Sequence, residues 1–162
     1  MREQEQVLNE RSVMHATFVI ERSYDASPAR AFKAWAEPAA KARWFGPSEG
    51  TNDGYELDFR VGGREHLSVG APDGSTYAFD CCYQDIVPDE RIVYAYDMHR
   101  DEVRISVSLA TVEFKPDGAG TRLIFTEQAA FLDDQDTAGE RERGTRTLLE
   151  NLGAELQRER LQ

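Results

Sequence analysis

Hydrophobic and polar residues alternate along much of the chain, and this alternation predicts a series of β-strands. In residues 15–24, Phe18 and Ile20 share a parity among frequent β-branched residues, as in a strand with one buried face. Beyond Gly54 the alternation continues, interrupted only by short segments rich in Gly, Pro and Asp that are typical of turns. The six strands expected there span residues 55–61, 64–69, 76–87, 91–98, 103–115 and 121–130. The pattern therefore predicts a meander that, with the first strand, makes a seven-stranded sheet.

Helical signals appear at two places. Ser27 and Pro28 form a helix start, since a serine side chain caps free N–H groups and proline fits the first helical position. Pro38 then opens a second short helix, which we expect to end before Gly46. The final segment begins with Thr137 and Glu140 in a capping-box arrangement. It continues with leucines at helical spacing, namely Leu148, Leu149, Leu152 and Leu156. A helix of roughly 24 residues would be about 36 Å long, enough to cross a sheet.

The strand expected at residues 103–115 changes its parity. Its apolar residues are odd-numbered up to Leu109, whereas Val112 and Phe114 are even-numbered. A β-bulge near Ala110 and Thr111 would place both sets on the core face, because one extra residue reverses the direction of each following side chain. The alternative is that part of the outer face is buried, as in a homodimer. We favour the bulge.

Composition limits the organisation and the partners. A chain of 162 residues with 40% hydrophobic and 30% charged residues suits one globular domain. We expect a domain over residues 13–162 after a flexible N-terminal extension, residues 1–12. The net charge of −11 disfavours nucleic acid and anionic membranes as partners. We see neither a signal peptide nor a membrane span and expect a cytoplasmic protein.

Cysteine and histidine usage gives little support for a metal site. Cys81 and Cys82 are adjacent in an expected strand, where a disulfide between them would be strained, so we expect free thiols. His15, His66 and His99 are scattered and show no zinc-ligand spacing. His99 is expected in a turn, as a solvated histidine. We therefore predict no metal ligands and no cofactor.

The order of elements and several short motifs resemble a known superfamily. The matching stretches are SPARAFKAW (27–35), RWFGP (43–47), VGGR (61–64), PDG (72–74), IVPDERIVY (86–94), TVEF (111–114) and GTRL (120–123). Together they are similar to the START-like (SRPBCC) superfamily, which includes polyketide cyclase/dehydrase-like proteins. Within it they most resemble the family named for the C-terminal domain of the Hsp90 ATPase activator. The resemblance implies an α+β helix-grip fold, a curved antiparallel sheet with a cavity under the C-terminal helix.

Two carboxylates stand out against this background. Glu65 has the parity of Leu67, and Glu127 that of Phe125, so both are expected on the apolar side of the sheet. In the resembled family the position of Glu65 usually carries an apolar residue. If both face the cavity, they could share a proton or hold a ligand, with pKa values raised by desolvation. The alternative is that each lies at a sheet edge or pairs with an arginine such as Arg22 or Arg64 for structural reasons.

Further candidates come from the strands and helices expected around the cavity. Tyrosines can supply hydrogen bonds within an apolar pocket. The two tryptophans lie on the short helices expected after the first strand, where they could line the mouth of the cavity. The complete set of expected ligand-binding residues is Trp35, Trp44, Glu65, Leu67, Tyr83, Tyr94, Tyr96, Glu127, Leu148, Leu149 and Leu152. Core packing explains the tyrosines about as well, and for the two tryptophans it is the favoured explanation.

Three functions are compatible with these patterns. The first is binding or carriage of a small hydrophobic or aromatic molecule. The second is a cyclase, dehydratase or hydrolase with Glu65 or Glu127 as general acid/base. The third, implied by the resemblance, is a co-chaperone-like module that stimulates a chaperone ATPase. No residue set in the sequence identifies a substrate.

Overall fold

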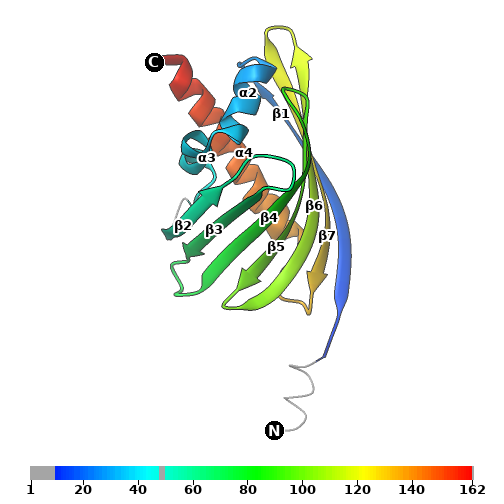
Figure 1. Cartoon of the computed structure of the whole chain (residues 1–162). Helices are drawn as coiled ribbons and strands as arrows, with labels where there is room; N and C mark the ends of the chain where they lie inside the picture. The colour runs from blue at the N-terminus through cyan, green and yellow to red at the C-terminus, as the bar shows by residue number, and fades with distance from the viewer. Residues whose placement is uncertain (1–9, 48–49, 162) are drawn as a thin grey trace.

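The computed structural model describes residues 10–47 and 50–161, so the expected flexibility of residues 1–9 lies outside the described chain. Seven antiparallel strands form one sheet in the order β1-β7-β6-β5-β4-β3-β2. They are β1 (Val13–Tyr24), β2 (Thr51–Leu57), β3 (Arg64–Gly70), β4 (Thr76–Val87), β5 (Arg91–Arg100), β6 (Val103–Asp117) and β7 (Gly120–Leu132). The sheet curves around the long helix α4 (Ala138–Leu161), as Figure 1 shows. The fold is the α+β helix-grip arrangement.

Two short helices follow β1 as the proline positions predict. In α2 (Pro28–Ala36) the Ser27 side chain accepts a hydrogen bond of 3.2 Å from the Arg30 N–H, and α3 (Pro38–Trp44) begins at the second proline. At the start of α4, the Thr137 hydroxyl accepts from the Glu140 N–H at 3.2 Å. The Glu140 carboxylate contacts Arg143 instead of returning to the cap, so one half of the expected capping box is seen.

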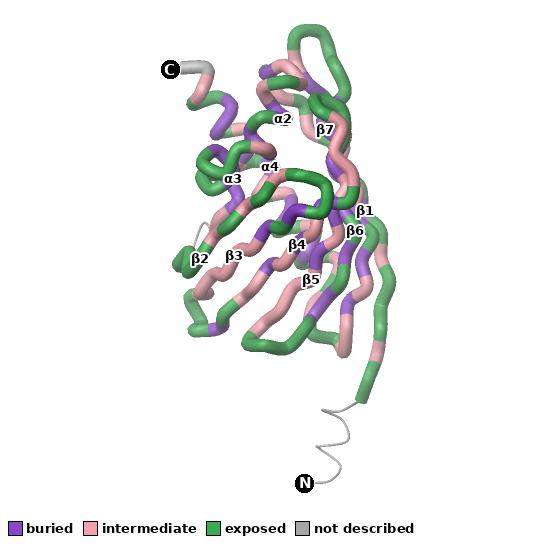
Figure 2. The backbone as a smooth tube through the Cα atoms, viewed as in Figure 1, coloured by how far each residue is buried: buried purple, intermediate pink, exposed green. Residues whose placement is uncertain are grey.

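Several contacts hold α4 against the rest of the domain. Leu149, Leu152 and Leu156 are buried under the sheet and the short helices, and Leu148 is half-buried. Buried and half-buried segments face one another across this interface, whereas hairpin tips are exposed (Figure 2). The Tyr24 hydroxyl donates to the Leu149 carbonyl oxygen at 2.7 Å. These contacts fix the position of α4 over the concave face.

The bulge predicted near Ala110 lies elsewhere. In the pairing of β5 with β6, Met98 faces Ser106 and His99 faces Arg104, which leaves Ile105 as the extra residue. From Ser106 onward the even-numbered side chains of β6 point inward, and Val107 and Leu109 are 44% and 40% exposed on the outer face. The strand does contain a bulge, but about five residues before the predicted position, and the prediction that it would bring Val107 and Leu109 to the core face was wrong.

Other boundaries also differ from the predicted ones. β2 spans Thr51–Leu57, earlier than the expected 55–61, because the chain turns between Asp58 and Gly63 before β3. His99 is half-buried within β5 and does not lie in a turn. Ser12, expected in the flexible extension, accepts a hydrogen bond from the Asp133 N–H at 2.8 Å and donates its own N–H to Oδ1 of Asp133 at 2.9 Å. None of the described helices is long and apolar enough to cross a membrane.

Candidate functional site

A hollow of about 460 Å³ lies between the inner face of the sheet and α4. Its walls are mostly apolar and come from strands β3 to β7, from the two short helices and from α4. Exposed α4 residues such as Thr147 belong to its lining, so the hollow reaches the surface. Eight of the eleven predicted ligand-binding residues line it, namely Trp35, Trp44, Leu67, Tyr94, Tyr96, Glu127, Leu148 and Leu149. Glu65, Tyr83 and Leu152 are absent from the lining.

Aromatic rings form the floor of the hollow. Phe79 lies 4.8 Å from Tyr96 and 5.0 Å from Phe45, measured between ring centroids. Trp35 and Trp44, carried by the two short helices, contact each other edge to face at 4.8 Å. Such rings offer a rigid apolar surface, which suits the binding of a ring-containing or aliphatic molecule.

One end of the hollow is polar and centres on Glu127 of β7. Oε2 of Glu127 accepts hydrogen bonds from the Tyr96 hydroxyl at 2.7 Å and the Ser108 hydroxyl at 2.9 Å. Arg141 of α4 lies 3.4 Å from the same oxygen and donates to Ser106 at 2.7 Å. Arg141 also pairs with Asp136 at 2.9 Å. We call these residues the Glu127 cluster: Tyr96, Ser106, Ser108, Glu127, Asp136 and Arg141.

The second oxygen of Glu127 has no protein partner among the described residues. This atom, Oε1, is buried. A buried acceptor without a donor is costly, so this atom favours contact with a donor that enters the hollow. Burial raises the pKa of the Glu127 carboxyl, an effect that Arg141 and the hydroxyls of Tyr96 and Ser108 only partly offset. The Glu127 carboxyl therefore binds its proton more tightly than a solvent-exposed glutamate does.

A second buried carboxylate, Glu65 of β3, lies in a closed environment. Lys41 of α3 is 2.7 Å from Oε1 of Glu65, and both side chains are fully buried. The Tyr83 hydroxyl also donates to Oε1, at 2.5 Å, and the Tyr55 hydroxyl donates to Oε2 at 2.7 Å. Both carboxylate oxygens are therefore satisfied by protein groups. We call these residues the Lys41 cluster: Lys41, Tyr55, Glu65 and Tyr83.

The Lys41 ammonium group is also surrounded by aromatic rings. It lies 4.3 Å from the ring centroid of Phe45 and 5.0 Å from that of Trp35. Cation–π contacts of this kind stabilise a desolvated cation. Burial, followed by the nearby Glu65 charge, raises the pKa values of Tyr55 and Tyr83, which keeps both phenols neutral hydrogen-bond donors. Glu65 thus has the structural partner that we considered, although the partner is a lysine where we named arginines.

The structure separates the two carboxylates that we considered as one proton-sharing pair. Glu65 has Lys41 and two tyrosines as partners and Glu127 has Arg141 and one tyrosine, so the two clusters are distinct. Cys81 faces inward beside the Lys41 cluster, and burial raises the pKa of its thiol, which leaves it a poor nucleophile. Both cysteines are free, as expected.

Sequence reasoning missed the two cations. Arg141 lies four residues before the buried Thr145 and eleven before Leu152, which places it on the buried face of α4. Lys41 is one turn before the buried Trp44 on α3. The helical spacing was a usable signal in both cases. Charged residues are mostly solvated, however, so the spacing alone did not distinguish these two cations from surface residues.

Comparisons with known proteins agree with the fold. The family model described as Activator of Hsp90 ATPase homolog 1-like protein matches residues 25–157. A putative uncharacterized protein from Rhizobium leguminosarum is 48% identical, with a TM-score of 0.89 over 93% of this chain and 99% of that one. The Mll3558 protein from Rhizobium loti is 49% identical, with a TM-score of 0.82 over 89% and 99%. A Staphylococcus aureus protein of unknown function, SA2116, shares the fold at 18% identity and a TM-score of 0.75, over 93% and 99%. No curated protein matches the chain.

Proposed function

The chain belongs to the family of Activator of Hsp90 ATPase homolog 1-like proteins, and we propose that it binds a small, largely apolar molecule in the hollow under α4. The observation that carries this proposal is the buried Oε1 of Glu127, which has no partner among the described residues and belongs to a residue that lines a mostly apolar hollow. A bound molecule that donates a hydrogen bond to this oxygen would remove the cost of leaving it unpaired.

The same lining offers a complementary donor. The indole Nε1 of Trp35 is buried and lacks an acceptor among the described residues. The ligand that fits best therefore has a rigid apolar body, a donor for Glu127 and an acceptor for Trp35. A hydroxyl group suits Glu127 in either protonation state, because a hydroxyl both donates and accepts hydrogen bonds.

Two simple probes test this proposal. We expect 2-naphthol to bind more tightly than 2-methoxynaphthalene, which has a similar apolar body but no hydroxyl donor. In Glu127→Leu the two probes should bind equally, because the acceptor is gone. Fluorescence titration measures both affinities. Equal affinities in the unaltered protein would contradict the role of Glu127, and failure of both probes to bind would contradict this ligand class.

A pair of glycines on α4 provides a matched control for the location. A Cβ atom added at Gly144 or Gly139 meets no atom within 4 Å, but only Gly144 lines the hollow. We expect Gly144→Trp to weaken 2-naphthol binding at least tenfold and Gly139→Trp to leave it unchanged. Equal effects at the two positions would place the ligand elsewhere.

Catalysis is the second candidate, and the raised pKa of Glu127 favours it. A carboxyl with a raised pKa in a cavity, hydrogen-bonded to a tyrosine, is suited to general acid/base chemistry. Glu65 is less suited, since both of its oxygens are engaged within the Lys41 cluster. Any turnover found should be abolished in Glu127→Gln.

The family description names an ATPase activator, so a chaperone is a further candidate partner. An ATPase stimulation assay with a cognate chaperone would test it.

We propose the reducing cytoplasm as the compartment, because Cys81 and Cys82 are free thiols on opposite faces of β4.

A further inference from the structure

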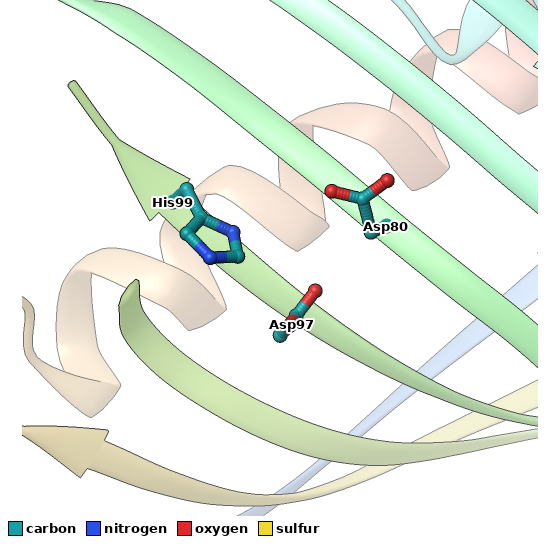
Figure 3. A group of neighbouring side chains, drawn as sticks. All are labelled: Asp80, Asp97 and His99. Atoms are coloured by element: carbon teal, nitrogen blue, oxygen red, sulfur yellow. The ribbon is translucent and has the colours of Figure 1, made fainter. Parts of the chain in front are cut away.

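A second group of polar side chains lies on the outer face of the sheet, across the strands from the hollow. Asp80 of β4 pairs directly with Asp97 of β5, and His99 follows two residues later on the same face. Figure 3 shows the three side chains gathered over these two strands. All three are half-buried. Two like charges directly opposite each other in a sheet are unfavourable, and of the two carboxylates only Asp97 has an arginine partner among the described residues, Arg104 at 3.1 Å, so a further positive charge beside Asp80 would be favourable.

We propose that Asp80, Asp97 and His99 form a binding site for a divalent transition-metal ion. One ligand atom from each residue lies within 4.8 Å of those of the other two. Two atoms that each lie about 2.2 Å from one ion are at most about 4.4 Å apart, so small side-chain rotations bring the three onto a common ion.

Neighbouring side chains hold the two carboxylates in place. His66 of β3 lies beside Asp80, with its Nδ1 atom 2.7 Å from Oδ1. Nε of Arg104 is 3.1 Å from Oδ2 of Asp97. Each carboxylate therefore keeps one oxygen that these two neighbours do not contact. Partners of this kind around the ligands are a regular feature of metal sites, where they fix the ligand orientation.

The surroundings also favour a cation. A hollow on the outer face is lined by Asp80 and His99 together with Asp101 and Glu102. These side chains add negative charge to one side of the site, which raises the local concentration of cations.

The ligand types indicate the class of metal. One imidazole nitrogen and two carboxylate oxygens suit Zn²⁺, Mn²⁺, Co²⁺ or Ni²⁺, whereas Ca²⁺ requires six to eight oxygen ligands. Three protein ligands leave coordination positions for water, so we expect an exchangeable ion. The sequence did not indicate this site, because His99 was expected in a turn and the strand register that pairs Asp80 with Asp97 was not known.

Isothermal titration of the tag-free, metal-stripped protein with Zn²⁺ tests the proposal, and the visible absorption spectrum of bound Co²⁺ reports coordination directly. We expect one Zn²⁺ per chain. Affinity should fall at least 100-fold in His99→Ala and Asp80→Asn, and about 10- to 100-fold in His66→Ala, which removes only a positioning residue. His15→Ala removes a histidine elsewhere on the chain and should leave binding unchanged.

Thermal unfolding of each variant checks that it is folded, and the half-exposed His99 position allows substitution even if Asp80→Asn fails to fold. Absence of Zn²⁺ and Co²⁺ binding would overturn the proposal and would leave His66 and Arg104 as the neutralising groups. Equal loss of affinity in His15→Ala and His99→Ala would also overturn it, because it would indicate dispersed surface binding.

Discussion

The Lys41 cluster and the Glu127 cluster are built from the same kinds of side chain. They differ in whether every oxygen of the buried glutamate has a hydrogen-bond partner. Each cluster contains a buried glutamate, a basic side chain and at least one tyrosine hydroxyl. Glu65 has protein partners on both oxygens, and it is absent from the lining of the hollow. Glu127 keeps Oε1 without a partner among the described residues, and it lines the hollow. The contrast teaches that burial and charge alone do not distinguish the two glutamates, and that our proposal of a ligand contact rests on the unsatisfied oxygen of Glu127.

The basic residues contribute to this difference. Lys41 directs a compact ammonium group at one carboxylate oxygen inside an aromatic shell. The Arg141 guanidinium divides its hydrogen bonds among Tyr96, Ser106 and Asp136 and lies further from its glutamate, at 3.4 Å. A planar group with five donors can serve several acceptors at once, so Glu127 is only partly satisfied by its cation.

The largest expected effect comes from removing the cation of the closed cluster. Lys41→Met leaves the Glu65 carboxylate buried without its counter-charge, and we expect the free energy of unfolding to fall by about 3–5 kcal/mol. Urea denaturation at pH 7 measures this loss. The double variant Lys41→Met/Glu65→Gln removes the stranded charge and should recover about half of it. A loss below about 1 kcal/mol in the single variant would show that the pair is not sealed from water.

A smaller effect is expected at the half-buried edge of the same cluster. Tyr55→Phe removes the 2.7 Å hydrogen bond to Oε2 of Glu65 and leaves that oxygen as unsatisfied as Oε1 of Glu127. We expect a loss of about 1.5 kcal/mol in the free energy of unfolding. Tyr77→Phe, at another half-buried tyrosine, is the control and should change stability by less than about 0.5 kcal/mol. Equal values for the two variants would mean that the Tyr55 hydrogen bond adds nothing.

The smallest effect concerns the pH dependence of the open cluster. Because the pKa of Glu127 is raised in the folded state, the folded protein holds this proton at pH values where the unfolded chain releases it. Its contribution therefore favours folding at low pH and is lost as the pH rises from about 4.5 through the folded-state pKa. Glu127→Gln lacks this titration, so its stability relative to the unaltered protein should increase over that interval.

Urea denaturation of both proteins at several pH values between about 4 and 8 measures this difference. Taking the difference cancels the carboxylates whose pKa values are lowered, such as Glu155 beside Arg43, which act in the opposite direction. A difference that stays constant with pH, or that favours the unaltered protein as the pH rises, would contradict the raised pKa of Glu127.

The sequence predicted most of the fold because its main signals are local. Strand alternation, the prolines at the starts of α2 and α3, and the threonine cap of α4 each act over a few residues. The bulge was misplaced because a parity change shows that one residue is extra without showing which one. The apolar character of Val107 and Leu109 indicated that their side chains are buried, although both are exposed on the outer face of the sheet.

The candidate site was predictable only in part. Strand parity placed Glu65 and Glu127 inside the sheet correctly. Their roles depend on partners that lie 24 residues before Glu65 and 14 residues after Glu127, on helices whose packing no local pattern specifies. The pairing of Asp80 with Asp97 depends in the same way on the register between β4 and β5.

The position of Arg141 has a consequence for how the protein would respond to a bound ligand. This side chain is carried by α4, while Glu127 is carried by β7, so their contact ties the helix to the sheet at the same carboxyl that would meet the ligand. If a ligand contacts Glu127 as proposed, we expect its binding and the attachment of α4 to be thermodynamically linked, because a change in the charge of Glu127 alters its contact with Arg141. Amide hydrogen exchange along the first turns of α4 would then report whether a ligand occupies the hollow.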